Sequence, residues 1–129
     1  MYVYKAKLDR IIDGDTVDAV IDLGFDVSVH KRIRLAGIDT PESRTRDLEE
    51  KERGLASKAR LEEMLKVGEC ILESKEVGKY GRVLGTLFIE KISEDNLTAE
   101  PQTIQININE TLVREGYAVE YWGGKKKKK

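Results

Sequence analysis

The sequence contains few of the residues on which whole classes of protein site depend. Its 129 residues include one cysteine, one histidine and two prolines, and only 6% are aromatic. Cys70 has no second cysteine for an internal disulfide, so there is no disulfide framework and the redox compartment stays open. His30 has no second histidine, which argues against a zinc site and against a histidine-based catalytic triad. We interpret His30 as a surface residue and Cys70 as a small core side chain.

Long hydrophobic runs and an excess of positive charge are also missing. No apolar stretch approaches the roughly 20 residues that span a membrane, so no membrane association is expected. The N-terminus has no hydrophobic signal-peptide segment, so a cytoplasmic protein is the default expectation, or a secreted one if a leader has been removed. Without the five lysines of residues 125–129 the chain has 18 basic and 24 acidic residues, a net charge of −6. Any binding of nucleic acid must therefore use local basic groups and a metal rather than bulk charge.

The pattern of apolar residues predicts one β-rich domain over residues 1–122. Alternating apolar and β-branched runs predict five strands, with tight turns at Asp13-Gly14-Asp15 and at Gly24. The predicted strands are two within residues 2–23, one over 27–35 that Pro41 ends, one over 70–74 and one over 83–89, with a further short strand at 103–106. Residues 75–82 and 91–102 are predicted connections. Residues 123–129, two glycines and five lysines, have the composition of a flexible tail.

Two helices interrupt the strand pattern. Residues 48–67 fit a helix that Gly68 stops, and its apolar face is predicted to consist of Leu55, Ala56, Ala59, Leu61, Met64 and Leu65. Asn107 and Glu110 have the spacing of a capping box and would begin a short helix that ends at Gly116. The pattern alone supports a β-rich α+β class, and the element order suggests a small Greek-key barrel.

Acidic and basic residues concentrate in three short segments. They are Ile-Asp-Gly-Asp-Thr-Val at 12–17, Arg-Leu-Ala-Gly-Ile-Asp-Thr-Pro-Glu at 34–42, and Lys-Tyr-Gly-Arg at 79–82. Together they supply oxygen ligands for a cation, a carboxylate near that cation, and two arginines. A site that cleaves a phosphodiester needs this set, because the metal neutralises phosphate charge, a carboxylate handles a water and guanidinium groups hold the phosphate.

These segments, followed by Asn-Glu-Thr-Leu-Val-Arg-Glu-Gly at 109–116, resemble the staphylococcal nuclease (thermonuclease-like) family over about residues 7–121. The resemblance implies an α+β, mainly β fold: a five-stranded OB-fold Greek-key barrel with an inserted helix and a second short helix. Two departures stand out. The loop at 91–102 is longer than the turn usual there, and the C-terminal helix of the family has no counterpart before the glycine and lysine tail.

The resemblance also implies a Ca²⁺ site. Asp15 and Asp39 match the positions that bind Ca²⁺ through side chains, and Thr40 matches the one that binds through its carbonyl. Asp13 matches an acidic position near the metal, where we expect it to act through water or through its field. Taken alone, each aspartate would more often be a turn or cap residue.

Three residues match catalytic positions of the family. Glu42 matches the residue that acts on the attacking water, either as a general base or by orienting the water. Arg34 and Arg82 match the two arginines, whose planar charged forks suit a phosphate that gains charge in the transition state. Arg32 has no catalytic match, and we interpret it as a surface charge.

Other residues match positions that contact substrate. Lys79 and Tyr80 match phosphate-contacting positions, although Tyr80 could equally pack on the barrel. Either Tyr121 or Trp122 is expected to take the role of stacking on a base. The lysine tail could be an arm that binds phosphates or an incidental solubilising segment.

The sequence therefore predicts a monomeric, Ca²⁺-dependent, sugar-nonspecific nuclease of DNA and RNA. It is expected to prefer single-stranded or open regions, to act as an endonuclease with exonuclease activity allowed, and to leave 3′-phosphates. The alternative is a non-catalytic OB-fold module that binds nucleic acid or protein. Such modules typically lose the acidic or arginine positions, all of which are present here. A third and weaker hypothesis is a phosphatase that acts on small phosphate esters.

Overall fold

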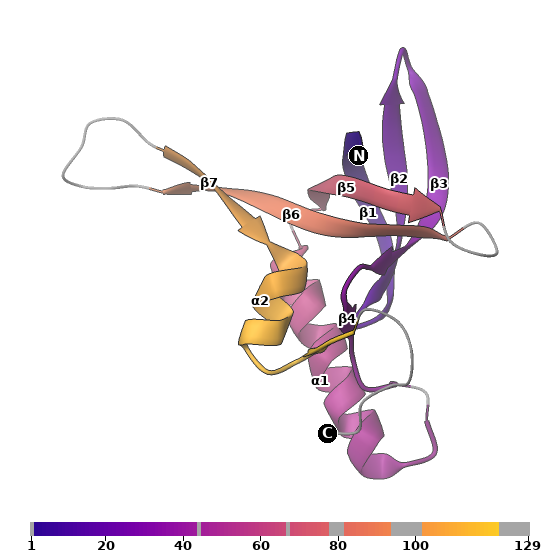
Figure 1. The fold of residues 1–129 in the computed structure, drawn as a ribbon, viewed down its shortest axis with the longest axis vertical. Coiled ribbons are helices and arrows are strands. Elements are labelled where there is room, and N and C mark those ends of the chain that lie inside the picture. The colour runs from indigo at the N-terminus through magenta and orange to yellow at the C-terminus, as the bar shows by residue number, and fades with distance from the viewer. Residues whose placement is uncertain (1, 44, 67, 78–81, 94–101, 122–129) are drawn as a thin grey trace.

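The computed structural model describes residues 2–43, 45–66, 68–77, 82–93 and 102–121. Strands dominate this part of the chain (Figure 1). In chain order the elements are β1 (Tyr2–Asp13), β2 (Thr16–Gly24), β3 (Val27–Leu35), β4 (Ile38–Asp39), α1 (Leu48–Met64), β5 (Glu69–Val77), β6 (Val83–Ser93), β7 (Gln102–Asn107), α2 (Ile108–Arg114) and β8 (Val119–Glu120).

Five strands close into a barrel. They lie in the order β3-β2-β1-β5-β6, each antiparallel to its neighbour, and a parallel pairing of β3 with β6 closes the ring. Beyond the barrel, β7 pairs with β6, and β4 pairs with β8 in a separate two-stranded sheet. The two helices lie together below the strands in Figure 1. The predicted OB-type α+β barrel with two helices is therefore confirmed.

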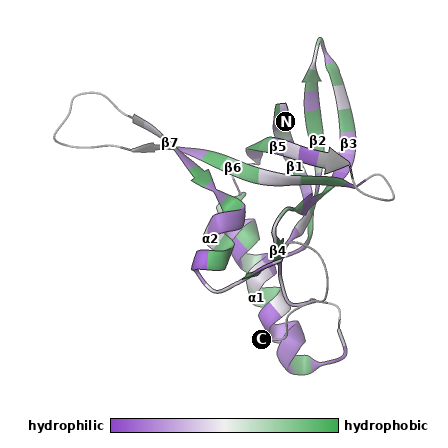
Figure 2. Cartoon of the chain, in the orientation of Figure 1, coloured by the Kyte–Doolittle hydropathy of each residue, from purple (hydrophilic) through white to green (hydrophobic). Residues whose placement is uncertain are grey.

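The core lies inside the barrel and between its strands and the helices. Side chains that point inward alternate along the strands with polar ones, which Figure 2 shows as alternating colours on β2 and β3. The largest fully buried hydrophobic side chains are Ile33, Leu35, Leu61, Leu65, Leu72, Leu87, Ile108, Leu112 and Val17. Cys70 is part of this core, as predicted, and burial raises the pKa of its thiol to about 11.

A protruding hairpin joins β2 to β3. Gly24 pairs with Val27, which leaves a two-residue loop, and both Phe25 and Asp26 have positive φ, at 55° and 61°. This is the backbone of a type I′ turn, which favours asparagine followed by glycine. A side chain on a left-handed residue costs roughly 1–2 kcal/mol, and Phe25 is fully exposed, so packing does not offset that cost.

Replacing this turn should therefore stabilise the protein. We expect Phe25→Asn combined with Asp26→Gly to raise the free energy of unfolding by about 1 kcal/mol, because the new residues accept positive φ more readily. Urea denaturation monitored by circular dichroism measures the change. Phe25→Ala alone is the control, since it removes the exposed ring and keeps the strain. An equal gain from the control would contradict the backbone explanation.

The predicted buried face of α1 is confirmed at Leu61, Met64 and Leu65 and is wrong in the first half of the helix. Leu55, at 47% exposure, Ala56 and Ala59 lie outside the core. The buried residues of the helix are Gly54, Ser57, Leu61 and Met64. Hydrophobicity favours placing leucine and alanine inward, but the chain before α1 packs against the helix here and needs small residues. The N-cap of the helix was also not predicted. The Asp47 side chain caps α1 by accepting from the amides of Glu49 and Glu50.

β3 spans the predicted residues 27–35. The chain leaves this strand well before Pro41, because Gly37 has φ +75° and turns it into β4. The pairing of β4 with β8 was not predicted from the sequence. Both β5 and β6 are longer than predicted. The connections expected at 75–82 and 91–102 fall partly in these strands, and residues 78–81 and 94–101 lie outside the described residues.

The helix ends follow the sequence signals. Gly68, with φ +85°, donates its amide to the Leu65 carbonyl just after α1. The side chain of Asn107 accepts from the Glu110 amide at the start of α2, as the capping spacing predicted. In the described part of the chain, neither helix is long and apolar enough to cross a bilayer.

Candidate active site

Asp15 lies in the turn between β1 and β2 and is 7% exposed. One of its oxygens, Oδ1, accepts from the Thr16 hydroxyl at 2.9 Å. The other, Oδ2, accepts from the Thr40 amide at 3.1 Å and lies 3.3 Å from Nη1 of Arg34. The Asp15 carbonyl in turn accepts from the Leu35 amide. These contacts tie the turn both to β3 and to the chain that follows β4.

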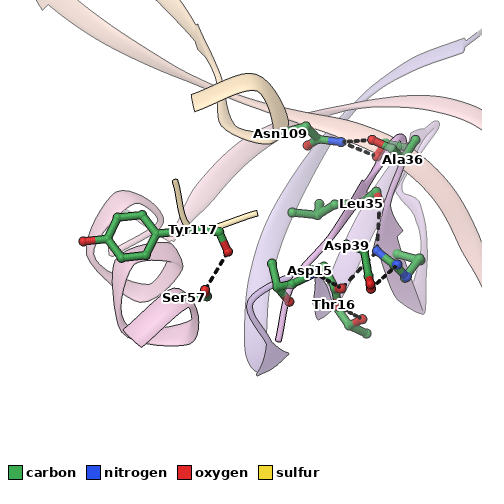
Figure 3. Close-up of polar contacts among 11 residues, drawn as sticks. Asp15, Thr16, Leu35, Ala36, Asp39, Ser57, Asn109 and Tyr117 are labelled. Carbon is green, nitrogen blue, oxygen red and sulfur yellow. Dashed lines mark hydrogen bonds and ion pairs between the residues drawn. The ribbon is translucent and has the colours of Figure 1, made fainter. Parts of the chain in front are cut away.

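Arg34 joins two acidic side chains. Its Nη2 donates to Oδ1 of Asp39 at 3.4 Å, while Nη1 lies beside Asp15 and donates to the Leu35 carbonyl at 3.1 Å. Only 21% of the Arg34 side chain is exposed. Asp15 and Asp39 lie close to each other in Figure 3, and both carboxylates contact Arg34. The structure thus brings together Asp15, Arg34, Asp39 and Thr40, four of the residues that the sequence predicted for the site.

The donor set fits a hard cation. Within the described residues no group of three or more His, Cys, Asp and Glu side chains forms a metal-binding cluster. However, the carboxylates of Asp15 and Asp39 both contact the guanidinium group of Arg34, and the buried Oγ1 of Thr40 has no hydrogen-bond partner. Two carboxylates with oxygens of the adjacent chain are the ligand chemistry of Ca²⁺, which completes its shell with water.

Asp13 and Glu42 adjoin the same corner of the molecule, by which we mean the region around the four residues just named. Asp13 accepts a short hydrogen bond from the Ser43 hydroxyl, which ties the end of β1 to the loop after β4. Glu42, the residue before Ser43, has an exposed side chain. The Ser43 brace was not predicted, because no spacing rule links residues 30 positions apart.

Arg82 is exposed and immediately precedes β6. Its neighbour Val83 pairs with Ile33, the neighbour of Arg34, in the parallel ladder that closes the barrel. The backbone segments that carry the two predicted arginines therefore lie side by side, although no described contact joins the arginine side chains. The catalytic assignments of Arg34, Glu42 and Arg82 remain predictions.

A buried asparagine holds this closure together. The amide nitrogen of Asn109 donates to the carbonyls of Ala36, at 2.9 Å, and Gly85, at 3.2 Å. Its oxygen accepts from the Leu87 amide at 3.2 Å. Figure 3 shows Asn109 reaching from α2 to Ala36. The sequence offered one signal, a polar residue at a position of a short helix that the apolar pattern places inward.

Arg32 and His30 bind partners outside this corner. Arg32 donates from Nε and Nη2 to the two carboxylate oxygens of Asp18, at 2.8 and 3.2 Å. This hydrogen bonding holds the pKa of the largely buried Asp18 below its usual value. His30 is exposed and contacts Asp9, which fits its interpretation as a surface residue.

The predicted substrate-contacting residues are only partly described. Lys79, Tyr80 and Trp122 lie outside the described residues. Tyr121 is half-buried, and its amide donates to the Gly37 carbonyl at 2.8 Å, so the chain at Tyr121 lies beside the turn that leads to Asp39. Its stacking role remains a prediction.

Comparison with known proteins agrees with this geometry. The family described as staphylococcal nuclease homologue matches residues 32–129. The chain is 32% identical over 122 residues to micrococcal nuclease of Shigella flexneri, which covers 93% of this chain and 61% of that protein. The chain belongs to the staphylococcal nuclease homologue family.

Two further relatives match the chain over a similar share of their length. The chain is 31% identical over 117 residues to Protein ParB of Escherichia coli, covering 91% of this chain and 57% of that protein. It is 31% identical over 138 residues to uncharacterized protein MJ1439 of Methanocaldococcus jannaschii, covering 92% and 59%. The chain thus spans roughly 60% of the length of these relatives. At the level of the family, the resemblance predicted from the sequence motifs is confirmed.

Proposed function

We propose that this chain is a Ca²⁺-dependent, sugar-nonspecific nuclease that hydrolyses phosphodiester bonds of DNA and RNA. The observation that carries the proposal is the convergence of Asp15 and Asp39 on the guanidinium group of Arg34. Two carboxylates beside a fixed arginine provide both a cation site and a phosphate site in one corner. Membership of the staphylococcal nuclease homologue family supports the same reaction.

The cation would be held by the carboxylates of Asp15 and Asp39 and by the Thr40 carbonyl, with Asp13 acting through water. When bound, Ca²⁺ supplies positive charge against which the phosphate can bind and gain further charge. The unpartnered hydroxyl of Thr40 lies beside these groups. Exclusively oxygen donors favour Ca²⁺ over Zn²⁺, which prefers nitrogen and sulfur ligands.

The other predicted site residues would have separate roles in the reaction. Glu42 orients a water or accepts its proton as the water oxygen forms a bond to phosphorus. The bond from phosphorus to the 5′ oxygen then breaks, and this oxygen takes up a proton, which leaves a 3′-phosphate and a 5′-hydroxyl. Arg34 and Arg82 bind the phosphate oxygens more strongly as their charge increases. Lys79, Tyr80 and either Tyr121 or Trp122 would hold the flanking nucleotides of an open strand.

The alternative is a non-catalytic OB-fold module. It is disfavoured because binding alone requires neither a largely buried carboxylate pair nor an arginine between them, and burying such charges is costly. A third hypothesis is a phosphatase that acts on small phosphate esters, which a panel of substrates would distinguish from a nuclease.

We also propose that the nuclease cleaves endonucleolytically and acts as a monomer.

The test is cleavage of a single-stranded DNA oligonucleotide with end-group analysis. We expect Ca²⁺ to support cleavage, and both a chelator and the replacement of Ca²⁺ by Zn²⁺ to abolish it. Products should carry 3′-phosphates, and an RNA of the same sequence should also be cut. A small aryl phosphate is the control substrate and should remain intact. Full activity in chelator would contradict the proposal, and binding without any cleavage would favour the non-catalytic module.

A further inference from the structure

Helix α1 meets the candidate site at a position that has no side chain. A Cβ atom added at Gly54 would collide with the carbonyl group of Glu42 and would lie 2.7 Å from the Ser43 amide nitrogen. These are backbone atoms, so they cannot rotate away as the end of a flexible side chain could. The loop that carries Glu42 therefore rests directly on the bare backbone of the helix.

One helical turn further along, α1 also contacts the turn between β1 and β2 that carries Asp15. A Cβ atom at Gly14 would lie 2.7 Å from Cβ of Ser57 and 3.2 Å from Cγ2 of Thr40. Ser57 is 1% exposed and donates its hydroxyl to the Tyr117 carbonyl at 2.7 Å (Figure 3). The turn at Gly14 is thus packed between Ser57 of α1 and Thr40.

Helix stability does not explain the glycine. Gly54 is in the interior of the 17-residue helix α1, where glycine is among the least favourable residues. Alanine would be the better helix former, and the apolar pattern of the sequence predicted an inward face made of alanine and leucine. The close approach of Glu42 and Ser43 gives a reason for glycine that depends on the loop rather than on the helix.

We propose that Gly54 is a positioning residue for Glu42, with Ser43 as its brace. The bare helix backbone at Gly54 fixes how deeply the loop docks. The hydrogen bond from Ser43 to Asp13 fixes the loop sideways against the metal-binding turn. Together they place the Glu42 carboxylate relative to the metal site, without either residue touching substrate. The proposal rests on the nuclease function proposed above.

The first experiment is steady-state kinetics of Gly54→Ala on single-stranded DNA. We expect kcat at saturating substrate and Ca²⁺ to fall at least about tenfold, because displacing a reacting group by about 1 Å can cost far more than that. KM should change less than about threefold, since the atoms nearest to Gly54 belong to the backbone of Glu42 and Ser43, which have no predicted role in substrate binding. Ala56→Gly is the matched control, because it weakens the same helix at an exposed position. Its kcat should stay within about twofold of wild type. An equal kcat loss in both variants would overturn the proposal.

A double variant tests whether Gly54 acts through Glu42. Glu42→Gln alone should lower kcat by roughly 10²-fold. If Gly54 only positions this carboxylate, adding Gly54→Ala to Glu42→Gln should cause no further loss. If the kcat losses of the two single variants multiply in the double variant, Gly54 acts by another route. If Gly54→Ala does not fold, Ser43→Ala replaces it in the same cycle, because it adds no atoms and removes the brace. An unchanged kcat in Ser43→Ala would overturn the proposal.

A measurement without substrate or metal separates this inference from the proposed function. The backbone amide resonances of Glu42 and Ser43 should shift in Gly54→Ala and stay in place in Ala56→Gly. Resonances that do not move in Gly54→Ala would overturn the positioning role. A wild-type protein that lacks Ca²⁺-dependent cleavage would instead contradict the nuclease function, whatever these resonances show.

Discussion

Replacing Arg34 by glutamine is expected to lower kcat by roughly 10²-fold or more, because a phosphate that gains charge loses one of its fixed donors. Free Ca²⁺ should at the same time bind more tightly. Arg34 places a positive charge 3.3 and 3.4 Å from the Asp15 and Asp39 carboxylates, and removing it removes repulsion of the cation. Cleavage kinetics and calorimetric titration of the substrate-free protein measure the two effects.

Arg32→Gln is the matched control, two residues away on the same strand. Arg32 pairs with Asp18, so its loss should leave kcat within about twofold and should destabilise the protein instead, because Asp18 is largely buried. The assignment of Arg34 would be wrong if both variants kept kcat, or if Arg34→Gln weakened Ca²⁺ binding. Lysine at position 34 should rescue little, since it presents one point charge instead of a fork.

The stability loss in Arg32→Gln should also depend on pH. Arg32 lowers the pKa of Asp18 in the folded protein, so the pair stabilises the fold above the unfolded carboxyl pKa of about 4. This contribution disappears as the pH falls through the lowered folded value, where Asp18 becomes protonated. Wild type and variant should therefore differ in stability at neutral pH and converge at strongly acid pH.

Local signals made much of the fold predictable from the sequence. Asp-Gly and Gly24 marked the first two turns, Asn107 marked the start of α2, and alternation marked the strands, because each signal depends on neighbouring residues alone. The short motifs also indicated a candidate site, since Asp15, Arg34 and Asp39 occur in segments that resemble one family. The structure brings these three residues into contact, and their functional roles remain predictions.

What could not be predicted depends on contacts between distant parts of the chain. The inward face of the first half of α1 was misassigned because the loop at Glu42 needs a bare helix backbone at Gly54, and a hydrophobicity pattern contains no such requirement. The pairing of β4 with β8 involves two residues on each side, too few for a periodic signal. Arg32 is exposed, as predicted, but its pairing with Asp18 was not predicted because Asp18 lies on the adjacent strand.

Asn109 is the residue whose loss should destabilise the fold most clearly. Its side chain, in a residue that is only 5% exposed, satisfies three backbone groups: the Leu87 amide and the carbonyls of Ala36 and Gly85. Asn109→Leu keeps a similar volume and removes this partner from all three groups, of which the Gly85 carbonyl still accepts from the Ala36 amide. Because each buried group left unsatisfied costs about 1–3 kcal/mol, we expect the free energy of unfolding to fall by about 3 kcal/mol.

Two companion variants show whether the partners or the helix are responsible. Asn107→Ala removes the cap of α2 and should cost only about 1 kcal/mol. Asn109→Asp keeps the acceptor for Leu87 but loses both donors to the carbonyls, so it should also be strongly destabilising at neutral pH. Urea denaturation of the three proteins gives the comparison. A loss in Asn109→Leu no larger than that in Asn107→Ala would mean that the barrel closes without this side chain. A larger loss would show that one residue of α2 holds together the β3–β6 seam from which Arg34 and Arg82 extend.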